Sequence, residues 1–134
     1  MGTSPWMPDL SLFALRLGVA WGMLYSHGWG KWQRLFSDGE IQFADPIGLG
    51  EPASLALAVF SEFVCALLVI LGLFHRAASF FLAFTMLVAF FIVHGGDPFA
   101  DREMAFLYGL AFLFLMFSGP GKYALDAYLF KKKP

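Results

Sequence analysis

The hydrophobic and polar positions divide the chain into four long apolar stretches separated by polar segments. The stretches cover residues 10–28, 53–74, 77–93 and about 98–118. A helix needs roughly 20 apolar residues to cross a hydrocarbon core of about 30 Å, and each stretch approaches that length. The pattern therefore predicts an all-α fold, an integral membrane antiparallel four-helix bundle that forms a single domain over residues 1–134.

The segments between the stretches predict how the bundle is oriented. Only His75 and Arg76 separate the second and third stretches, which predicts a tight antiparallel turn on the same side of the membrane as both termini. That side carries Arg76, Lys122, Lys131, Lys132 and Lys133, and the other carries Lys31, Arg34 and Arg102. The positive-inside rule then places both termini in the cytoplasm. Residues 122–133 are predicted to lie along the inner lipid surface, with a disordered tail as the alternative.

Composition agrees with a chain that is surrounded by a lipid bilayer. Hydrophobic residues make up 59% of the sequence, charged residues only 14%, and there are 17 phenylalanines. Mean hydropathy is +0.68, far above that of ordinary soluble domains. The net charge of −1 gives no general attraction to nucleic acid. Cys65 is the sole cysteine, so the chain has no dithiol through which to relay electrons.

Two ionisable residues, Arg16 and Glu62, lie near the middle of apolar stretches. Such residues are costly in a membrane and usually face the interior of a bundle or a wet cavity. Arg16 lies in the first stretch and Glu62 in the second, at depths that we expect to match within about one helical turn. We therefore predict an Arg16–Glu62 ion pair within the membrane. The pair could be a structural clasp that fixes helix register, or part of a functional site.

A second polar group is predicted at the outer end of the bundle. Lys31 follows His27 at i,i+4, and His27 follows Arg16 by about three turns, so one helix face would carry all three. Antiparallel packing is expected to bring this face close to the end of the third stretch and the start of the fourth. The resulting candidate polar site comprises His27, Lys31, His94, Asp97 and Glu103. The alternative for each histidine alone is an interfacial residue that marks a helix end.

The residue types in this candidate site favour a quinone. Histidine exchanges a proton near neutral pH and can hydrogen-bond a carbonyl oxygen, and a neighbouring carboxylate can pass the proton on. Two histidines on facing helices could instead ligate haem b, which is the weaker alternative because the lysine and carboxylates make the site more polar than that role requires. No metal ion is expected, since the sequence has no H-E-x-x-H motif and no cysteine set.

The order of these features resembles the DoxX family of small bacterial four-helix membrane proteins. The resemblance rests on an H-G-x-x-K element matched by His27, Gly28 and Lys31, and on a glutamate followed by a G-L-x-x-R turn. The glutamate is Glu62, and the turn is Gly72, Leu73 and Arg76. The final apolar stretch is followed by GPGKYALD. The resemblance implies a protein of the bacterial or archaeal plasma membrane, whose relatives include a membrane subunit of thiosulfate:quinone oxidoreductase and proteins of oxidative-stress and thiol-redox complexes.

These observations lead to one principal hypothesis and two alternatives. The principal hypothesis is a quinone-interacting subunit or accessory of a membrane redox system. Any oxidoreductase activity would require a partner subunit, because the chain has neither a large soluble domain nor a dithiol. The alternatives are a non-catalytic membrane scaffold for soluble redox or stress-response enzymes and a small transporter. The sequence does not identify the substrate or the partner, and it is compatible with a homo-oligomer.

Overall fold

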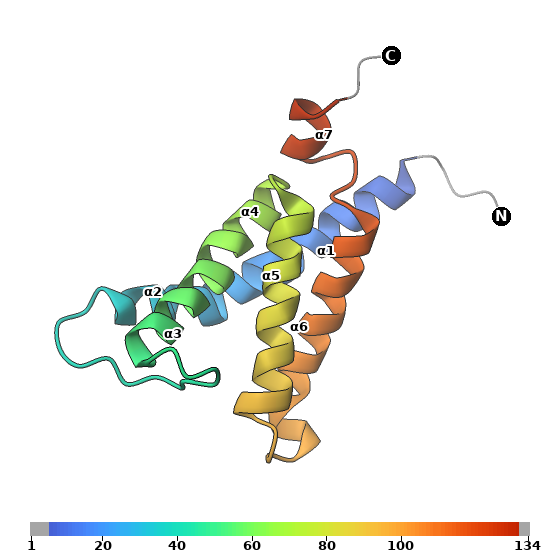
Figure 1. Cartoon of the computed structure of the whole chain (residues 1–134). Coiled ribbons are helices and arrows are strands. Elements are labelled where there is room, and N and C mark those ends of the chain that lie inside the picture. Colours follow the sequence, from blue (N-terminus) through green and yellow to red (C-terminus); the bar gives the residue numbers. More distant parts are fainter. Residues whose placement is uncertain (1–5, 132–134) are drawn as a thin grey trace.

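The structure is a computed structural model that describes residues 6–131, and within this range it is all-helical, with no strand. The elements are α1 (Met7–Met23), η1 (Leu24–Gly28), α2 (Trp29–Leu35), α3 (Glu51–Val59), η2 (Phe60–Cys65), α4 (Ala66–Leu71), α5 (His75–Val88), η3 (Ala89–Val93), α6 (Phe99–Ser118) and α7 (Leu125–Leu129). The η elements are π-helical turns within longer helices. The chain thus forms four long helices, at residues 7–35, 51–71, 75–93 and 99–118 (Figure 1).

The first long helix is longer than its apolar stretch. The sequence predicts an end at residue 28, but the helix continues through η1 and α2 to Leu35. Gly28 and Gly30 lie inside it and do not terminate it. Gly28 is buried against the backbone of the second long helix, where an added Cβ would collide. Because Gly28 has no side chain, the first and second long helices can approach each other closely there, and Gly28 does not mark a helix end.

Within the described residues 6–131, the second and third long helices are the two that are long and apolar enough to cross a membrane. They are Glu51–Leu71 and His75–Val93. They differ from the predicted stretches 53–74 and 77–93 mainly at the turn. Gly72 adopts a left-handed conformation with φ 69°, and its N–H bonds to the carbonyl of Val69 at 3.1 Å. The turn therefore ends before His75, which is the first residue of α5 and is fully buried.

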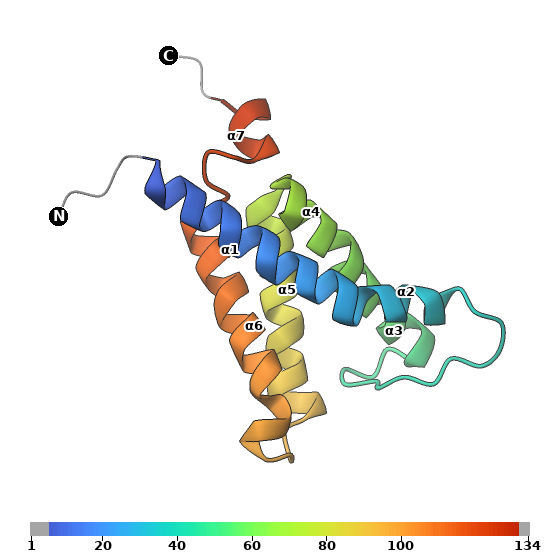
Figure 2. The ribbon, with the colours of Figure 1, turned by 180° about the vertical axis from the view of Figure 1, so that it is seen from behind.

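The four long helices pack as two antiparallel pairs. In the first pair α1 contacts α4, η1 contacts η2, and α2 contacts α3; in the second pair α5 and α6 contact each other extensively. Side chains from all four long helices meet in one hydrophobic core, which includes Met23, Val69, Leu82, Phe112 and Leu115. Figures 1 and 2 show that the α5–α6 pair diverges from α2 and α3 toward one end. The pairs are therefore held together at one end and splayed at the other.

We call the end with the 72–74 turn and the C-terminal segment the terminal end, and the end with residues 36–50 and the 94–98 turn the loop end. The C-terminal segment is attached at the terminal end. Asp126 accepts hydrogen bonds from the backbone N–H groups of Phe74 and His75, each at 2.8 Å, and so caps α5. In the structure this segment contains α7 and is attached to the start of α5 through Asp126. The predicted position on the lipid surface stays a prediction, and the rest of segment 122–133 lies outside the described residues.

Candidate functional site

The predicted Arg16–Glu62 ion pair is not formed. Arg16 lies near the terminal end, where Nη1 donates to the carbonyl of Pro120 at 3.1 Å and Nη2 donates to the carbonyl of Tyr123 at 2.6 Å. Only 1% of Arg16 is exposed. The depth estimate was wrong because α1, with Arg16, lies opposite α4, whereas η2, with Glu62, lies opposite η1. Arg16 instead fixes the C-terminal segment to the first long helix.

Glu62 forms its ion pair with Lys31. Lys31 Nζ lies 2.8 Å from Glu62 Oε1, with 22% of the lysine and 5% of the glutamate side chain exposed. Two local features bring them together: the first long helix continues past residue 28, and Gly28 allows close approach. An added Cβ at Gly28 would lie 2.7 Å from the carbonyl carbon of Glu62. Close by, Trp32 stacks on Phe63 with ring centroids 4.6 Å apart.

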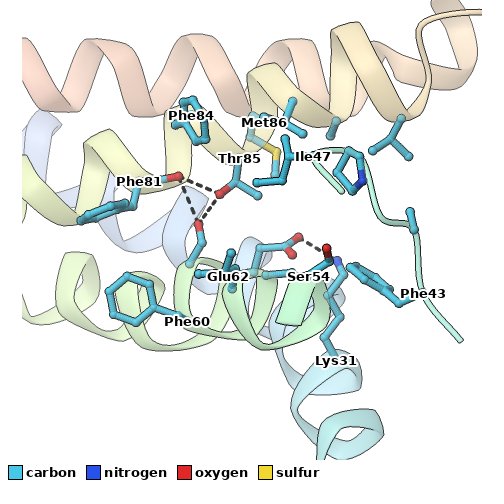
Figure 3. A pocket seen from close by; sticks show the side chains of 18 of the residues that line it. Lys31, Phe43, Ile47, Ser54, Phe60, Glu62, Phe81, Phe84, Thr85 and Met86 are labelled. Atoms are coloured by element: carbon cyan, nitrogen blue, oxygen red, sulfur yellow. Dashed lines mark hydrogen bonds and ion pairs between the residues drawn. The ribbon is translucent and has the colours of Figure 1, made fainter. Parts of the chain in front are cut away.

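This ion pair lines a pocket of about 510 Å³ between the second and third long helices (Figure 3). The walls are mainly apolar and come from α3, η2, α5 and η3, and part of the 36–50 loop completes the lining. Representative apolar lining residues are Phe43, Ile47, Leu57, Phe60, Phe81, Phe84, Met86 and Val93. The pocket lies where the two helix pairs diverge. Its combination of one buried ion pair and long apolar walls suits an amphipathic ligand with a small polar group.

The hydroxyl groups in the pocket already have partners. Thr85 Oγ1 lies 2.7 Å from Ser61 Oγ and 2.8 Å from the carbonyl of Phe81, and Ser61 Oγ donates to the same carbonyl at 3.2 Å. Their hydroxyl hydrogens are therefore used within the protein. A lysine ammonium carries three N–H donors, and Glu62 accepts from one. Lys31 is thus the cation that can also donate to a ligand in this pocket.

His94 and Asp97 also belong to the loop end. His94 follows η3 and lines the pocket that contains Lys31 and Glu62. Its Nδ1 lies 2.9 Å from Asp97 Oδ2, and nearly half of each side chain is exposed. Two of the predicted site residues, Lys31 and His94, therefore share one pocket. Asp97 reaches this pocket only through its contact with His94.

His27 and Glu103 do not line the pocket that contains Lys31, Glu62 and His94. The ring of His27 packs edge-on against Tyr108 of α6, with centroids 5.8 Å apart, and does not line the pocket. Glu103 is exposed on α6 and does not line it either. His27 lies within electrostatic range of both Lys31 and Glu62, although its ring faces Tyr108 and is not part of the pocket wall.

Sequence reasoning missed the Ser61–Thr85 hydrogen bond and the contribution of the 36–50 loop. Hydroxyl side chains within an apolar stretch are a signal that could have indicated Ser61 and Thr85, whereas the loop fold has no comparable signal. Within residues 6–131, no three His, Cys, Asp or Glu side chains gather closely enough to hold a metal ion. The chemistry that the pocket offers is hydrogen bonding and charge from Lys31, Glu62 and His94 beside apolar walls.

Comparison with known proteins places the site within a family. The protein-family model DoxX matches residues 11–95, which is more than half of the chain. The chain belongs to the DoxX family. The matched region contains Arg16, Gly28, Lys31, Glu62 and the pocket walls, and it ends before α6 and the C-terminal segment. All the residues that line the pocket therefore lie within the part of this DoxX protein that matches the family model.

Two curated relatives come from Haemophilus influenzae, and both are described as uncharacterized proteins. One is 40% identical over 126 residues, which cover 88% of this DoxX chain and 90% of the relative. The other is 29% identical over 133 residues, which cover 93% of this chain and 87% of the relative. The comparison with solved structures found no match. The relatives therefore agree in length and sequence but carry no functional description.

Proposed function

We propose that this DoxX-family protein is a four-span integral membrane protein of the bacterial or archaeal plasma membrane, and that its loop-end pocket binds a quinone. In this role it serves as a subunit or accessory of a membrane redox system. Electrons would come from a partner subunit, since the chain has a single cysteine and no dithiol. Both termini and the 72–74 turn would face the cytoplasm, so the pocket would lie toward the outer side of the membrane.

The surface of the helices supports the membrane placement. The second and third long helices are apolar enough to cross a bilayer, and large hydrophobic side chains are exposed along the helices. Examples are Phe84 at 51%, Phe91 at 65%, Leu110 at 51% and Phe117 at 73% exposed. An exposed apolar surface of this extent is costly in water and favourable in hydrocarbon. The buried charge of Arg16 is bonded to carbonyl groups and does not face outward.

The observation that carries the quinone proposal is the Lys31–Glu62 ion pair on the wall of an otherwise apolar pocket. A quinone has a flat apolar ring with carbonyl oxygens, and the spare N–H groups of Lys31 can donate to one of them. Glu62, only 5% exposed in its side chain, can accept a hydrogen bond from the hydroxyl of the reduced form. The Phe and Met side chains of the walls suit the ring itself.

The proposal is tested with protein purified in mild detergent. Binding of a short-tailed ubiquinone analogue is measured for the wild type and for Lys31→Met and Glu62→Gln. Both variants are expected to weaken binding at least about tenfold, in line with roughly 1.4 kcal/mol for one lost charge-assisted contact. Lys131→Met, at an exposed position outside the pocket, is the matched control and should bind like the wild type.

Helix content and elution volume show whether each variant is folded. Wild-type protein that binds no quinone, or folded Lys31→Met protein that binds as tightly as wild type, would overturn the proposal. If wild-type protein binds no quinone, the Lys31–Glu62 pair is better regarded as an ion pair that holds the first two long helices together, in agreement with the scaffold hypothesis.

A further inference from the structure

The pocket has a lateral opening, because several of its apolar lining residues are also exposed at the surface of the helices. On the second long helix these are Leu57, 50% exposed, and Phe60, 42% exposed. On α5 they include Phe81 and Phe84, at 43% and 51%. We call these four residues the lateral rim. These four side chains line the pocket and remain accessible from outside the protein, so the pocket is not closed between the two helices that carry them.

The lateral rim lies along the two helices that are apolar enough to span a bilayer. Phe81 and Phe84 lie in the middle of His75–Val93, and Leu57 and Phe60 lie in the middle of Glu51–Leu71. If both helices cross the membrane, the opening lies at the level of the hydrocarbon core and not in water. The polar end of the same pocket, at Lys31 and Glu62, is then reached from lipid past the rim.

The loop end of the pocket is lined by residues of the 36–50 loop. Phe43, Ala44, Pro46 and Ile47 all line the pocket (Figure 3 labels Phe43 and Ile47). This part of the loop is fixed by Asp45, whose carboxylate accepts hydrogen bonds from the N–H groups of Leu49 and Gly50 and from Ser54 Oγ at 2.9, 3.0 and 2.8 Å. The loop therefore stands between the pocket and the solvent at this end.

From these observations we infer that the ligand enters sideways from the bilayer and that its hydrocarbon tail lies across the lateral rim, while its polar ring rests beside Lys31 and Glu62. The substrate class is then a membrane quinone with a long isoprenoid or alkyl tail, as opposed to a water-soluble quinone. This inference rests on the proposed quinone function. Because hydrocarbon tails are as apolar in lipid as in the pocket, the rim sets the route and position of the tail more than it adds affinity.

The test uses spin-labelled protein in vesicles of phosphatidylethanolamine and phosphatidylglycerol. A nitroxide is attached to Phe84→Cys in a Cys65→Ala background. Matched control labels are attached to Phe117→Cys on α6, outside the pocket, and to Asp38→Cys in the loop. Collisions are measured with oxygen, which concentrates in hydrocarbon, and with a polar nickel chelate, which stays in water. Position 84 should resemble position 117, with many oxygen and few nickel collisions, and position 38 should show the reverse.

Quinones of two kinds are then added. Decylubiquinone should lower the oxygen collision rate at position 84 by at least about twofold and leave position 117 unchanged. The tail-less ring, ubiquinone-0, should compete for binding without this change at position 84. If decylubiquinone binds but position 84 does not respond, or if position 84 collides with nickel as often as position 38, the lateral route is overturned and the quinone function stands. If neither quinone binds, the proposed function fails, and with it the proposed occupant.

Discussion

Gly28 is the position at which a single methyl group should separate the first two long helices. An added Cβ would lie 2.7 Å from the carbonyl carbon of Glu62, 3.0 Å from the backbone nitrogen of Phe63, and closer still to the carbonyl oxygen of Glu62. All three neighbours are backbone atoms, so no side-chain rotation can relieve the contact. Gly28→Ala must therefore move one helix away from the other, and Lys31 moves with it.

The size of the effect follows from two opposing contributions. Alanine in place of glycine within a helix stabilises by about 0.5–1 kcal/mol, because glycine loses more backbone entropy on folding. Overpacking of a well-packed contact costs about 1–3 kcal/mol, and a contact with backbone belongs at the upper end. We therefore expect Gly28→Ala to lower the free energy of unfolding by about 2 kcal/mol. The displacement should also weaken quinone binding, since Lys31 no longer meets Glu62 at 2.8 Å.

Gly30 provides a matched control two residues further along the same helix. Nothing lies within 4 Å of an added Cβ there, so Gly30→Ala should leave the structure unchanged and gain about 0.5–1 kcal/mol of helix stability. Unfolding in mixed micelles of mild and denaturing detergent, followed by circular dichroism, gives both values. If Gly28→Ala is as stable as Gly30→Ala, the close approach at Gly28 does not exist, and the explanation given for the position of Lys31 is wrong.

Three further predictions concern the terminal end and the loop. Arg16→Met should lose two charge-assisted hydrogen bonds, which should lower the free energy of unfolding by about 3 kcal/mol and speed proteolysis of the C-terminal segment. Arg34→Met, at an exposed position, should change neither the stability nor the proteolysis. Asp126→Ala should remove the cap of α5 and lower the free energy of unfolding by about 1 kcal/mol. Amide exchange at the first residues of α5 should become faster, and unchanged exchange would contradict the cap. The hydrogen bond from Ser54 lowers the pKa of Asp45 below its ordinary 3.8, with backbone N–H groups adding to the effect. The contribution of Asp45 to loop order is therefore complete above that value and is lost as the pH falls through the lowered pKa, and loop amide exchange in Asp45→Asn should lack this pH dependence.

The sequence was sufficient for the helical class, the approximate helices and the family. Long apolar stretches with few Gly and Pro residues form helices in lipid, because a helix satisfies its backbone hydrogen bonds internally. The boundaries were less accurate where tertiary contacts decide them. His75 looked like a polar turn residue, but its ring bonds to the carbonyl of Leu115 at 2.9 Å and its N–H bonds to Asp126, so it is the buried start of a helix.

The partners of the buried charges could not be predicted for a different reason. Helix packing places α1, with Arg16, opposite α4, and η1 opposite η2, with Glu62, so Arg16 and Glu62 do not share one depth. The first helix also extends seven residues past Gly28, to Leu35. That extension carries Lys31 past the close contact and up to Glu62, while Arg16 meets carbonyl groups of a segment more than 100 residues away in sequence. Every residue has a backbone carbonyl, so the sequence does not indicate which carbonyl groups bond to Arg16. Glu62 was therefore predicted as its partner.

Three π-helical turns lie in the parts of the helices that surround the loop-end pocket. η1 and η2 interrupt the first and second long helices, and η3 ends the third. Each lies in or next to a part of the helix that supplies the pocket: Glu62 lies in η2, His94 directly follows η3, and Lys31 follows η1 by three residues. A π-helical turn adds a residue to the helix and rotates everything beyond it relative to the regular period. Side chains beyond these turns therefore point in directions that a 3.6-residue period does not give. The hydrophobic core lies mainly in the terminal halves of the helices, whereas the pocket with Lys31 and Glu62 on its wall lies beside the π-helical turns toward the loop end.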